Sequence, residues 1–199
     1  MIKLQVLLIA AGESKRMGQP KQLLAWQGKT LIEHQIEVLQ KAHLSLTVVL
    51  GAKAEIISKS ITNLDVQIVE NANWREGMGT SIACGVKEIC NLDSKPDGVL
   101  IALVDQPLIA VAHFEALIAN FEPRKQQIIM SESETGLRSA PVIFDAYYFE
   151  ALRRLQGDIG AKQIIKKHEN KVKTVLCKSS LEDVDTMDSY RRMLEDFSS

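Results

Sequence analysis

The chain has 199 residues, of which 46% are hydrophobic and 25% are charged. This length and composition predict a single globular domain over residues 1–199 and exclude a disordered or fibrous protein. With 24 basic and 25 acidic residues the formal net charge is -1, so the chain lacks the broad positive field of nonspecific nucleic-acid binding. We therefore expect no nucleic-acid partner, and any phosphate must be bound by local groups.

The remaining composition favours a cytoplasmic protein without a membrane partner. No apolar run reaches the length of about 18 residues that a membrane span needs. Residues 1–12 are predicted to enter a first buried strand instead of forming a signal peptide, because Gln5 interrupts an already short apolar segment. Cys84, Cys90 and Cys177 form no C-x-x-C pair, which is typical of a reducing compartment. The four histidines lack metal-ligand spacing and are interpreted as surface or packing residues.

Short β-like runs alternate with helix-period segments along the chain. The runs predicted as strands are residues 4–9, 47–50, 66–69, 99–104, 127–130, 142–144 and 172–176. Several of these runs are continuously apolar, which is typical of parallel strands covered on both faces. The predicted fold is therefore α/β, an open and mostly parallel twisted sheet with helices on both faces.

Side chains that can cap free amide groups mark the predicted helix starts. Thr30 and Glu33 form a capping-box pattern, and they predict a helix over about 31–42. Thr80 or Ser81 is predicted to cap the next helix. Further helices are predicted around 114–121 and after the candidate caps Asp145, Asp158 and Thr186. For Asp158 the alternative is a role in a substrate loop.

A glycine-rich loop directly follows the first predicted strand. It runs Ala10-Ala-Gly-Glu-Ser-Lys-Arg-Met-Gly-Gln-Pro-Lys21. Small residues let backbone N–H groups approach an anion, while Arg16 offers a forked donor and Lys21 a compact charge, a combination suited to a triphosphate. The spacing matches neither the P-loop nor the dinucleotide fingerprint G-x-G-x-x-G. Spacing alone also allows a solvated turn with two incidental charges.

An acidic residue is predicted at the same edge of the sheet as this loop. Asp105 directly follows the strand predicted over 99–104, at the carboxyl edge where open α/β sheets place their ligands. A carboxylate repels a triphosphate unless a hard cation lies between them, so Asp105 beside the loop predicts Mg²⁺. The alternative for Asp105 is a helix cap or a solvated turn.

The loop resembles the L-x-x-G-x-x-x-R-M-G-x-x-K signature of MobA-like nucleotidyltransferases, which are relatives of the sugar-1-phosphate and methylerythritol cytidylyltransferases. Further matching stretches follow in order at 22–26, 71–74, 76–81, 104–107, 157–161 and 183–186. The resemblance covers essentially the whole chain, and it implies a Rossmann-like nucleotidyltransferase fold.

The resemblance also implies roles for individual residues. Residues Ala10, Ala11 and Gly12 are implied to lie against the nucleotide, and Arg16 and Lys21 to contact its phosphates. The metal ligands implied are Asp105 and Asp185, with Asp183 a weaker candidate. Asn71, Gly77, Gly79 and Ser81 are implied to lie beside the nucleoside, where a turn followed by a helix cap is the alternative.

The implied reaction is transfer of CMP from CTP to the phosphate of molybdopterin, with Mg²⁺ and release of pyrophosphate. The Ala-Ala-Gly form of the loop is similar to that of molybdenum cofactor cytidylyltransferases, whereas the guanylyltransferase form usually carries Ala-Gly-Gly, so Ala11 favours CTP over GTP. Arg16, Lys21 and Asp105 are the implied catalytic residues. A molybdoenzyme or its chaperone is the implied recipient of the product.

Two departures from the family pattern leave the acceptor open. Arg138-Ser-Ala-Pro141 stands where many cytidylyltransferases carry Gly-His-Pro, and Met187 replaces a common Pro, a milder change. The alternatives are a relative that acts on another phosphorylated acceptor and an accessory protein that binds nucleotide or cofactor without turnover. A nicotinamide-dependent oxidoreductase is disfavoured by the missing dinucleotide fingerprint. Trp26 and Trp74 are interpreted as packing aromatics, with stacking on a ligand as the alternative.

Overall fold

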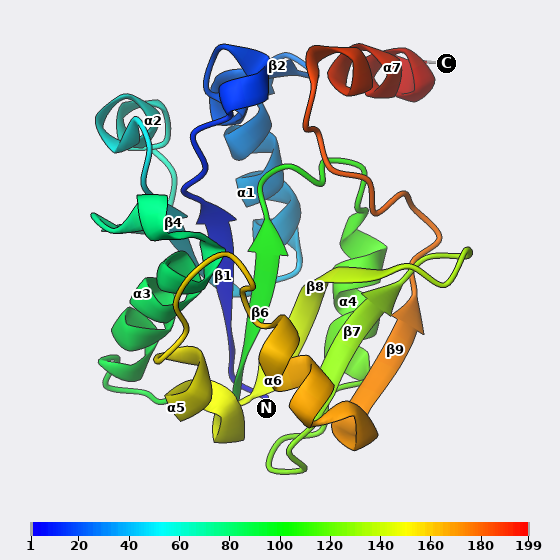
Figure 1. Cartoon of the computed structure of the whole chain (residues 1–199). Coiled ribbons are helices and arrows are strands. Elements are labelled where there is room, and N and C mark those ends of the chain that lie inside the picture. Colours follow the sequence, from blue (N-terminus) through cyan, green and yellow to red (C-terminus); the bar gives the residue numbers. More distant parts are fainter. Residues whose placement is uncertain (1, 199) are drawn as a thin grey trace.

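The computed structural model describes residues 2–198, and side chains through residue 196. Its centre is a seven-stranded sheet in the order β5-β4-β1-β6-β8-β7-β9 (Figure 1). The strands are β1 Leu4–Ala10, β4 Ser45–Leu50, β5 Gln67–Glu70, β6 Gly98–Leu103, β7 Ile128–Glu132, β8 Arg138–Asp145 and β9 Val172–Leu176. Strand β8 runs antiparallel to β6 and β7, while the other pairs are parallel. All seven predicted strands and the α/β fold are confirmed.

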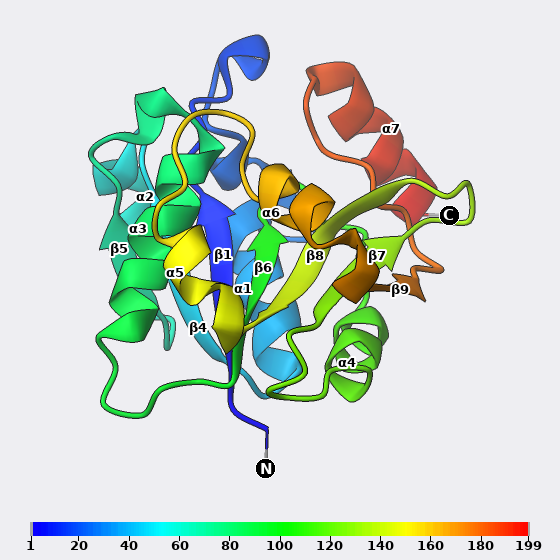
Figure 2. The ribbon, with the colours of Figure 1, turned by 60° about the horizontal axis from the view of Figure 1, so that its bottom comes forward.

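Helices cover both faces of the sheet. They are α1 Leu31–Lys41, α2 Ala54–Ser60, α3 Met78–Cys90, α4 Val111–Ala119, α5 Phe149–Leu152, α6 Lys162–Lys167 and α7 Met187–Ser198. Side chains of α1, α2 and α4 pack on one face in a first apolar cluster, and those of α3, α5 and α6 pack on the other face in a second (Figure 2). Strand β1 is buried at every position, including Gln5, and its otherwise apolar sequence suits this cover on both sides.

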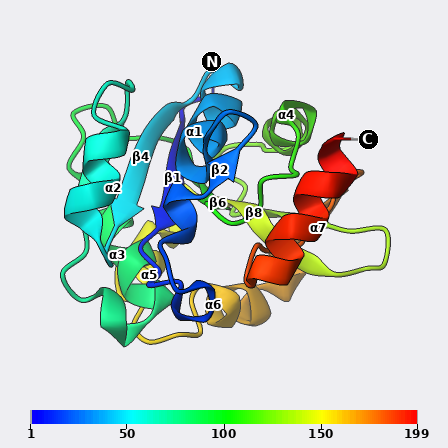
Figure 3. The same cartoon turned by 90° about the horizontal axis from the view of Figure 1, so that it is seen from above.

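A third apolar cluster lies at the carboxyl edge of the sheet. It joins the short hairpin of β2 Ala25–Trp26 and β3 Lys29–Thr30 to α7 and to the segment before it. Trp26 is fully buried there, as predicted for a packing aromatic, and it contacts the ring of Tyr190 with 6.4 Å between the centroids. The cluster therefore attaches the C-terminal helix above the sheet edge (Figure 3).

Three of the predicted helix caps are present. Thr30 accepts from the Glu33 amide while the Glu33 carboxylate accepts from the Thr30 amide, a complete capping box at the start of α1. Thr186 accepts from the Ser189 amide at 3.1 Å at the start of α7. Asp145 accepts from the Tyr147 amide at 2.9 Å, and it caps a short 3-10 turn that leads into α5.

Two predicted caps are wrong. Helix α3 begins at Met78 after Gly77, not at Thr80 or Ser81, because Gly77 has a φ of 113° and turns the chain into the helix earlier. The Thr80 hydroxyl instead donates to the carbonyl oxygen of Gly77 at 2.9 Å. Asp158 does not cap α6, whose N-cap is Ala161. Its side chain lines a cavity, which gives the residue a different position from the one predicted.

The capping box predicts a pH-dependent contribution to stability. Hydrogen bonds from Thr30 lower the pKa of the Glu33 carboxyl below its usual value. A lowered folded pKa stabilises the fold above the unfolded pKa of about 4.3, and this contribution is lost as pH falls through the folded pKa. Urea unfolding of wild type and Glu33→Gln should therefore differ more at pH 7 than at about pH 3. An equal difference at both pH values would show that the carboxylate charge contributes nothing.

Candidate active site

The loop after β1 is shaped by a buried amide side chain. Gln22 is fully buried, and its Nε2 donates to the carbonyl oxygens of Ala10 at 2.8 Å and Gly12 at 3.0 Å. The Lys21 amide donates to the Ser14 hydroxyl at 3.1 Å, which closes the loop on itself. Gln22 therefore fixes the backbone of the residues implied to lie against the nucleotide. Sequence reasoning gave Gln22 no role, because an amide between a lysine and a leucine carries no signal of its own.

Four charged side chains meet beside this loop in an alternating row. Lys21 Nζ lies 2.5 Å from Asp105 Oδ2 and 3.4 Å from Asp185 Oδ1. Arg16 donates to the other oxygen of Asp185 at 3.0 Å. Residues separated by as many as 169 positions in the sequence are thereby brought together, as the resemblance implied for Arg16, Lys21, Asp105 and Asp185.

The two neighbouring carboxylates set the charge state of the lysine in this row. The side chains of Lys21 and Asp105 are 13% and 16% exposed, whereas Asp185 is 43% exposed. Burial acts to lower the pKa of Lys21, but the Asp105 and Asp185 carboxylates outweigh it, so the pKa lies above its usual value. The ammonium is therefore held positive at neutral pH.

Asp183 lies near this row but is held differently. Burial, followed by the charge of Asp105, raises the pKa of its carboxyl to about 6, while a hydrogen bond with Gln106 acts in the opposite direction. The Gln106 amide also donates to the carbonyl oxygen of Leu181 at 3.2 Å. The Val184 amide donates to the carbonyl oxygen of Asp105 at 2.7 Å. These bonds attach the segment before α7 to the loop after β6, and so they position both aspartates of that segment.

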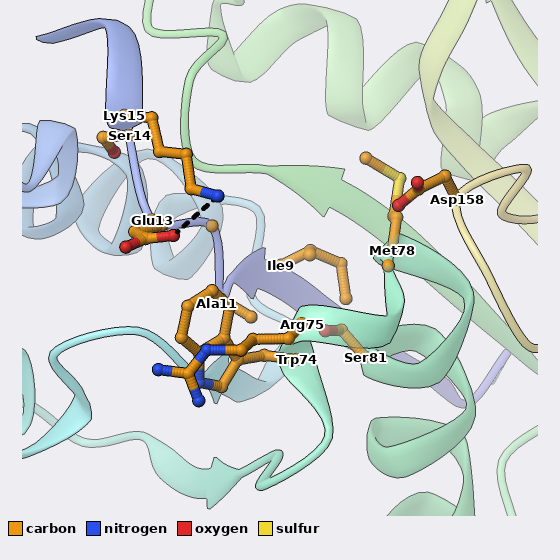
Figure 4. Close-up of a pocket in the computed structure, with 12 residues that line it drawn as sticks. Ile9, Ala11, Glu13, Ser14, Lys15, Trp74, Arg75, Met78, Ser81 and Asp158 are labelled. Carbon is orange, nitrogen blue, oxygen red and sulfur yellow. Dashed lines mark ion pairs between the residues drawn. The ribbon is translucent and has the colours of Figure 1, made fainter.

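A cavity of about 540 Å³ opens beside the loop (Figure 4). Its lining residues are Ile9, Ala11, Gly12, Glu13, Ser14, Lys15, Trp74, Arg75, Gly77, Met78, Ser81 and Asp158. A smaller cavity of about 170 Å³ shares Gly12, Ser14 and Lys15 with it and is also lined by Arg16, Lys21 and Asp185. The larger cavity has the size of a small-ligand site. The two cavities therefore lie on the same loop, and three members of the row of charges line the smaller one.

One wall of the larger cavity is aromatic. Trp74 packs so closely on the backbone that a Cβ added at Gly51 would lie 2.5 Å from the Trp74 Cβ. The Arg75 guanidinium lies 4.4 Å from the centroid of the Trp74 ring. Trp74 is thus a packing residue, as predicted, and also part of the cavity wall. A flat, half-buried ring in such a wall suits a stacked ligand.

The nucleoside residues implied by the resemblance lie at different depths. Ser81 lines the larger cavity, and its hydroxyl accepts from the Asn71 amide at 3.0 Å. Asn71 is buried behind Ser81 and lines a separate cavity. Gly79 donates its amide to the carbonyl oxygen of Gly157 at 2.8 Å. In this arrangement Asn71 positions Ser81, and Gly79 lets the 156–158 loop approach the start of α3.

Gly77 is predicted to be essential for the shape of this wall. A Cβ at Gly77 would lie 2.3 Å from Asp158 Oδ1 and 2.4 Å from the Gly157 carbonyl carbon, and its φ of +113° strains any side chain. The resemblance implies that this cavity binds CTP, so we expect Gly77→Ala to weaken CTP binding by about tenfold or more (about 1.4 kcal/mol), because the 157–158 loop must move. Calorimetric titration of the variant with CTP measures this change.

Gly136→Ala is the matched control for that variant. Gly136 also has a positive φ, of +80°, but no atom lies within 4 Å of its added Cβ. Backbone strain therefore affects both variants, but only Gly77→Ala adds a clash with the 157–158 loop. The expected loss of CTP affinity should be confined to Gly77→Ala. Equal CTP affinity in the two variants would show that the wall does not contact nucleotide.

The two carboxylates of the row fit a hard divalent cation. Asp105 and Asp185 each place one oxygen within 3.4 Å of the same Lys21 nitrogen, so their oxygens converge on one cation position. Within residues 2–198, no group of three or more His, Cys, Asp or Glu side chains is placed to hold a metal ion by itself. Mg²⁺ is usually held by one or two carboxylates together with substrate phosphates. The donor set therefore suits a metal shared with a nucleotide.

Comparison with curated proteins finds relatives with several activities. Nicotine blue oxidoreductase of Paenarthrobacter nicotinovorans is 31% identical, over 94% of this chain and 95% of that protein. Purine catabolism protein PucB of Bacillus subtilis is 29% identical, over 92% of each chain. A probable molybdenum cofactor guanylyltransferase of Bacillus cytotoxicus is 26% identical, over 62% of this chain and 65% of that protein.

Solved structures share the fold over its full length. Rv0371c from Mycobacterium tuberculosis superposes with a TM-score of 0.83 at 26% identity and 98% coverage of both chains. A manganese complex of Rv0371c superposes with a TM-score of 0.81 at 25% identity, covering 97% of this chain and 98% of that one. In the described part of this chain, no helix has both the length and the apolar character of a membrane span. The model of the MobA-like NTP transferase domain matches residues 6–172, and the chain belongs to this nucleotidyltransferase family.

Proposed function

We propose that the protein transfers CMP from CTP to the phosphate of molybdopterin and releases pyrophosphate. The observation that carries this proposal is the row Arg16, Asp185, Lys21 and Asp105 beside a loop that also lines a cavity large enough for a nucleoside. In this reaction an oxygen of the acceptor phosphate forms a bond to the α-phosphorus of CTP. The bond between the α-phosphorus and the bridging oxygen breaks, and its electron pair leaves with pyrophosphate.

The chain supplies binding and charge to this reaction. Arg16 and Lys21 bind the phosphates of CTP and offset the negative charge that develops on the leaving pyrophosphate. Backbone groups of Ala10, Ala11 and Gly12 lie along the nucleotide, in the conformation that Gln22 fixes. No protein nucleophile is required, because the acceptor phosphate is already anionic.

We propose Mg²⁺ as the metal and Asp105 and Asp185 as its ligands. When bound, the ion neutralises charge on the reacting phosphates. Lys21 contacts both carboxylates, so the same side chain must exchange these partners for phosphate oxygens when CTP enters. Asp183, whose carboxyl bonds with Gln106 beside this pair, is the weaker candidate for a metal ligand.

We propose CTP instead of GTP because the loop has the Ala-Ala-Gly form. Ala11, the residue that distinguishes this form, lines the larger cavity. Molybdopterin is proposed because the chain is similar over 62% of its length to a probable molybdenum cofactor guanylyltransferase. A molybdoenzyme or its chaperone in the cytoplasm is the proposed recipient of the product. Another phosphorylated acceptor and a binding protein without turnover are the alternatives within this fold.

A redox activity is the second candidate. It rests on one observation, the 31% identity to nicotine blue oxidoreductase over 94% of this chain. The loop after β1 lacks the dinucleotide fingerprint G-x-G-x-x-G, and its Arg16 and Lys21 side chains contact carboxylates at the proposed metal position. The site therefore favours nucleotidyl transfer, and a redox assay separates the two candidates.

The experiment measures pyrophosphate release by purified protein with Mg²⁺. CTP and GTP are tested in parallel, with and without molybdenum cofactor released from a denatured molybdoenzyme. We expect release with CTP that depends on the cofactor. Oxidation of NADH or NADPH, followed by absorbance, is the redox arm. Two outcomes would contradict the proposal. One is binding of CTP without pyrophosphate release, and the other is oxidation of NADH or NADPH in the absence of molybdenum cofactor.

A further inference from the structure

The Lys21 ammonium lies at the point where the proposed metal ligands converge. Three oxygens surround it: Asp105 Oδ2 at 2.5 Å, Asp185 Oδ1 at 3.4 Å and the carbonyl oxygen of Val184 at 3.4 Å. Two carboxylate oxygens and one carbonyl oxygen are also the oxygen types that bind hard cations. Lys21 thus occupies the position that the proposed function gives to Mg²⁺.

The charges within the row of Arg16, Asp185, Lys21 and Asp105 are already balanced. Asp105 and Asp185 carry two negative charges, and Lys21 and Arg16 carry two positive charges. Both oxygens of Asp185 are engaged, one by Lys21 and the other by Arg16. A free divalent cation that entered here would meet two resident cations, and both carboxylates of the row are already paired with them. Binding of the bare ion is therefore opposed by the chain itself.

A nucleotide removes both obstacles at once. Its phosphates offer Lys21 and Arg16 new anionic partners, and they add oxygens to a site where two carboxylates are the acidic ligands. The Lys21 amide is held by the Ser14 hydroxyl at 3.1 Å, so the backbone stays fixed while the four-carbon side chain reorients.

We propose that Lys21 reserves the metal position for a divalent cation that arrives with the nucleoside triphosphate. Free metal is excluded, and metal and nucleotide bind as one complex. This inference rests on the proposed use of Asp105 and Asp185 as ligands. It concerns binding order, so its test does not depend on turnover or on the identity of the acceptor.

The test measures Mn²⁺ binding without nucleotide, by the electron paramagnetic resonance signal of free Mn²⁺. Lys21→Met removes the ammonium and keeps the apolar stem, and we expect it to bind Mn²⁺ about tenfold or more tightly than wild type (about 1.4 kcal/mol). Lys59→Met is the control, since Lys59 pairs with Glu55 on α2 and is 73% exposed. A gain in the control equal to that of Lys21→Met would overturn the inference.

Two further variants separate the proposed effect from a general change of charge. Lys21→Arg keeps a cation and should bind Mn²⁺ as weakly as wild type. Adding Asp105→Asn to Lys21→Met should abolish the gain, because a ligand is lost. Mn²⁺ should also raise the melting temperature of Lys21→Met more than that of wild type, since binding to the folded state alone stabilises it. A Lys21→Met protein that folds but gains no Mn²⁺ affinity would contradict the inference.

Addition of a nonhydrolysable CTP analogue completes the test. We expect wild type to take up Mn²⁺ with the analogue and Lys21→Met to lose affinity for the analogue. Tight Mn²⁺ binding by wild type before the analogue is added would overturn the proposed order. A Mn²⁺ gain in Lys21→Met without any CTP turnover by wild type would support the binding order and refute the transferase proposal. CTP turnover by wild type without a gain of Mn²⁺ affinity in Lys21→Met would support the transferase proposal and refute the binding order.

Discussion

Replacement of Asp105 by Asn is expected to lower the rate of CMP transfer by about 10³-fold or more. Asp105 is 16% exposed, directly contacts Lys21, and is a proposed ligand of the metal that neutralises the reacting phosphates. Such neutralisation contributes several kcal/mol to transition-state stability, which corresponds to a rate factor of this size. Asn retains the shape of the side chain but removes its charge. Steady-state pyrophosphate release measures the loss.

Asp188→Asn controls for the removal of one negative charge. Asp188 lies in the first turn of α7 and is 95% exposed, so its replacement should leave the rate unchanged. Circular dichroism shows whether both variants remain folded. Wild-type turnover by folded Asp105→Asn would refute the role of Asp105 in the proposed mechanism.

Trp26→Ala is expected to destabilise the protein by about 3–5 kcal/mol, the usual range for a buried aromatic. Trp26 is fully buried in the third cluster, with Val184, Tyr190 and Met193. Val184 stands between Asp183 and Asp185 in the segment before α7. Loss of the indole should therefore loosen that segment as well as the core, and so lower Mn²⁺ affinity in the presence of a CTP analogue. Urea unfolding and Mn²⁺ titration measure the two effects.

Phe121→Ala separates stability from site geometry. Phe121 is 2% exposed in the first apolar cluster, and its ring approaches Gly98 at the start of β6, the opposite end of that strand from Asp105. We expect a similar loss of stability but unchanged Mn²⁺ affinity at temperatures where the variant is folded. Equal Mn²⁺ affinities in folded Trp26→Ala and folded Phe121→Ala would show that the third cluster does not position Asp183 and Asp185.

The main sheet could be predicted from sequence because its strands are short, apolar runs between turn residues. Elements whose conformation depends on tertiary contacts were missed. The β2–β3 hairpin has two residues in each strand, and α2 begins after Lys53, which has a φ of 57°. Helix α3 began earlier than its hydroxyl residues indicated, because a glycine, not a capping side chain, turns the chain there.

Within the site, residue types and their edge of the sheet were predictable, but their partners were not. The implied phosphate-binding residues Arg16 and Lys21 contact carboxylates, since the nearest anions in the fold are Asp185 and Asp105. Asp158 is of a residue type that often caps helices. Its loop instead packs on the start of α3, and this packing places Asp158 in the cavity wall. Such contacts depend on the packing of distant segments, which spacing along one sequence does not report.

The most direct test of nucleotidyl transfer follows the phosphorus atoms of CTP. Purified protein is incubated with Mg²⁺, molybdenum cofactor and CTP labelled either at the α- or at the γ-phosphorus. Attack at the α-phosphorus predicts that the α-label appears in the acceptor product and the γ-label in pyrophosphate, with neither transfer in Asp105→Asn. Label retained in intact CTP, or γ-label released as inorganic phosphate, would contradict the proposed reaction.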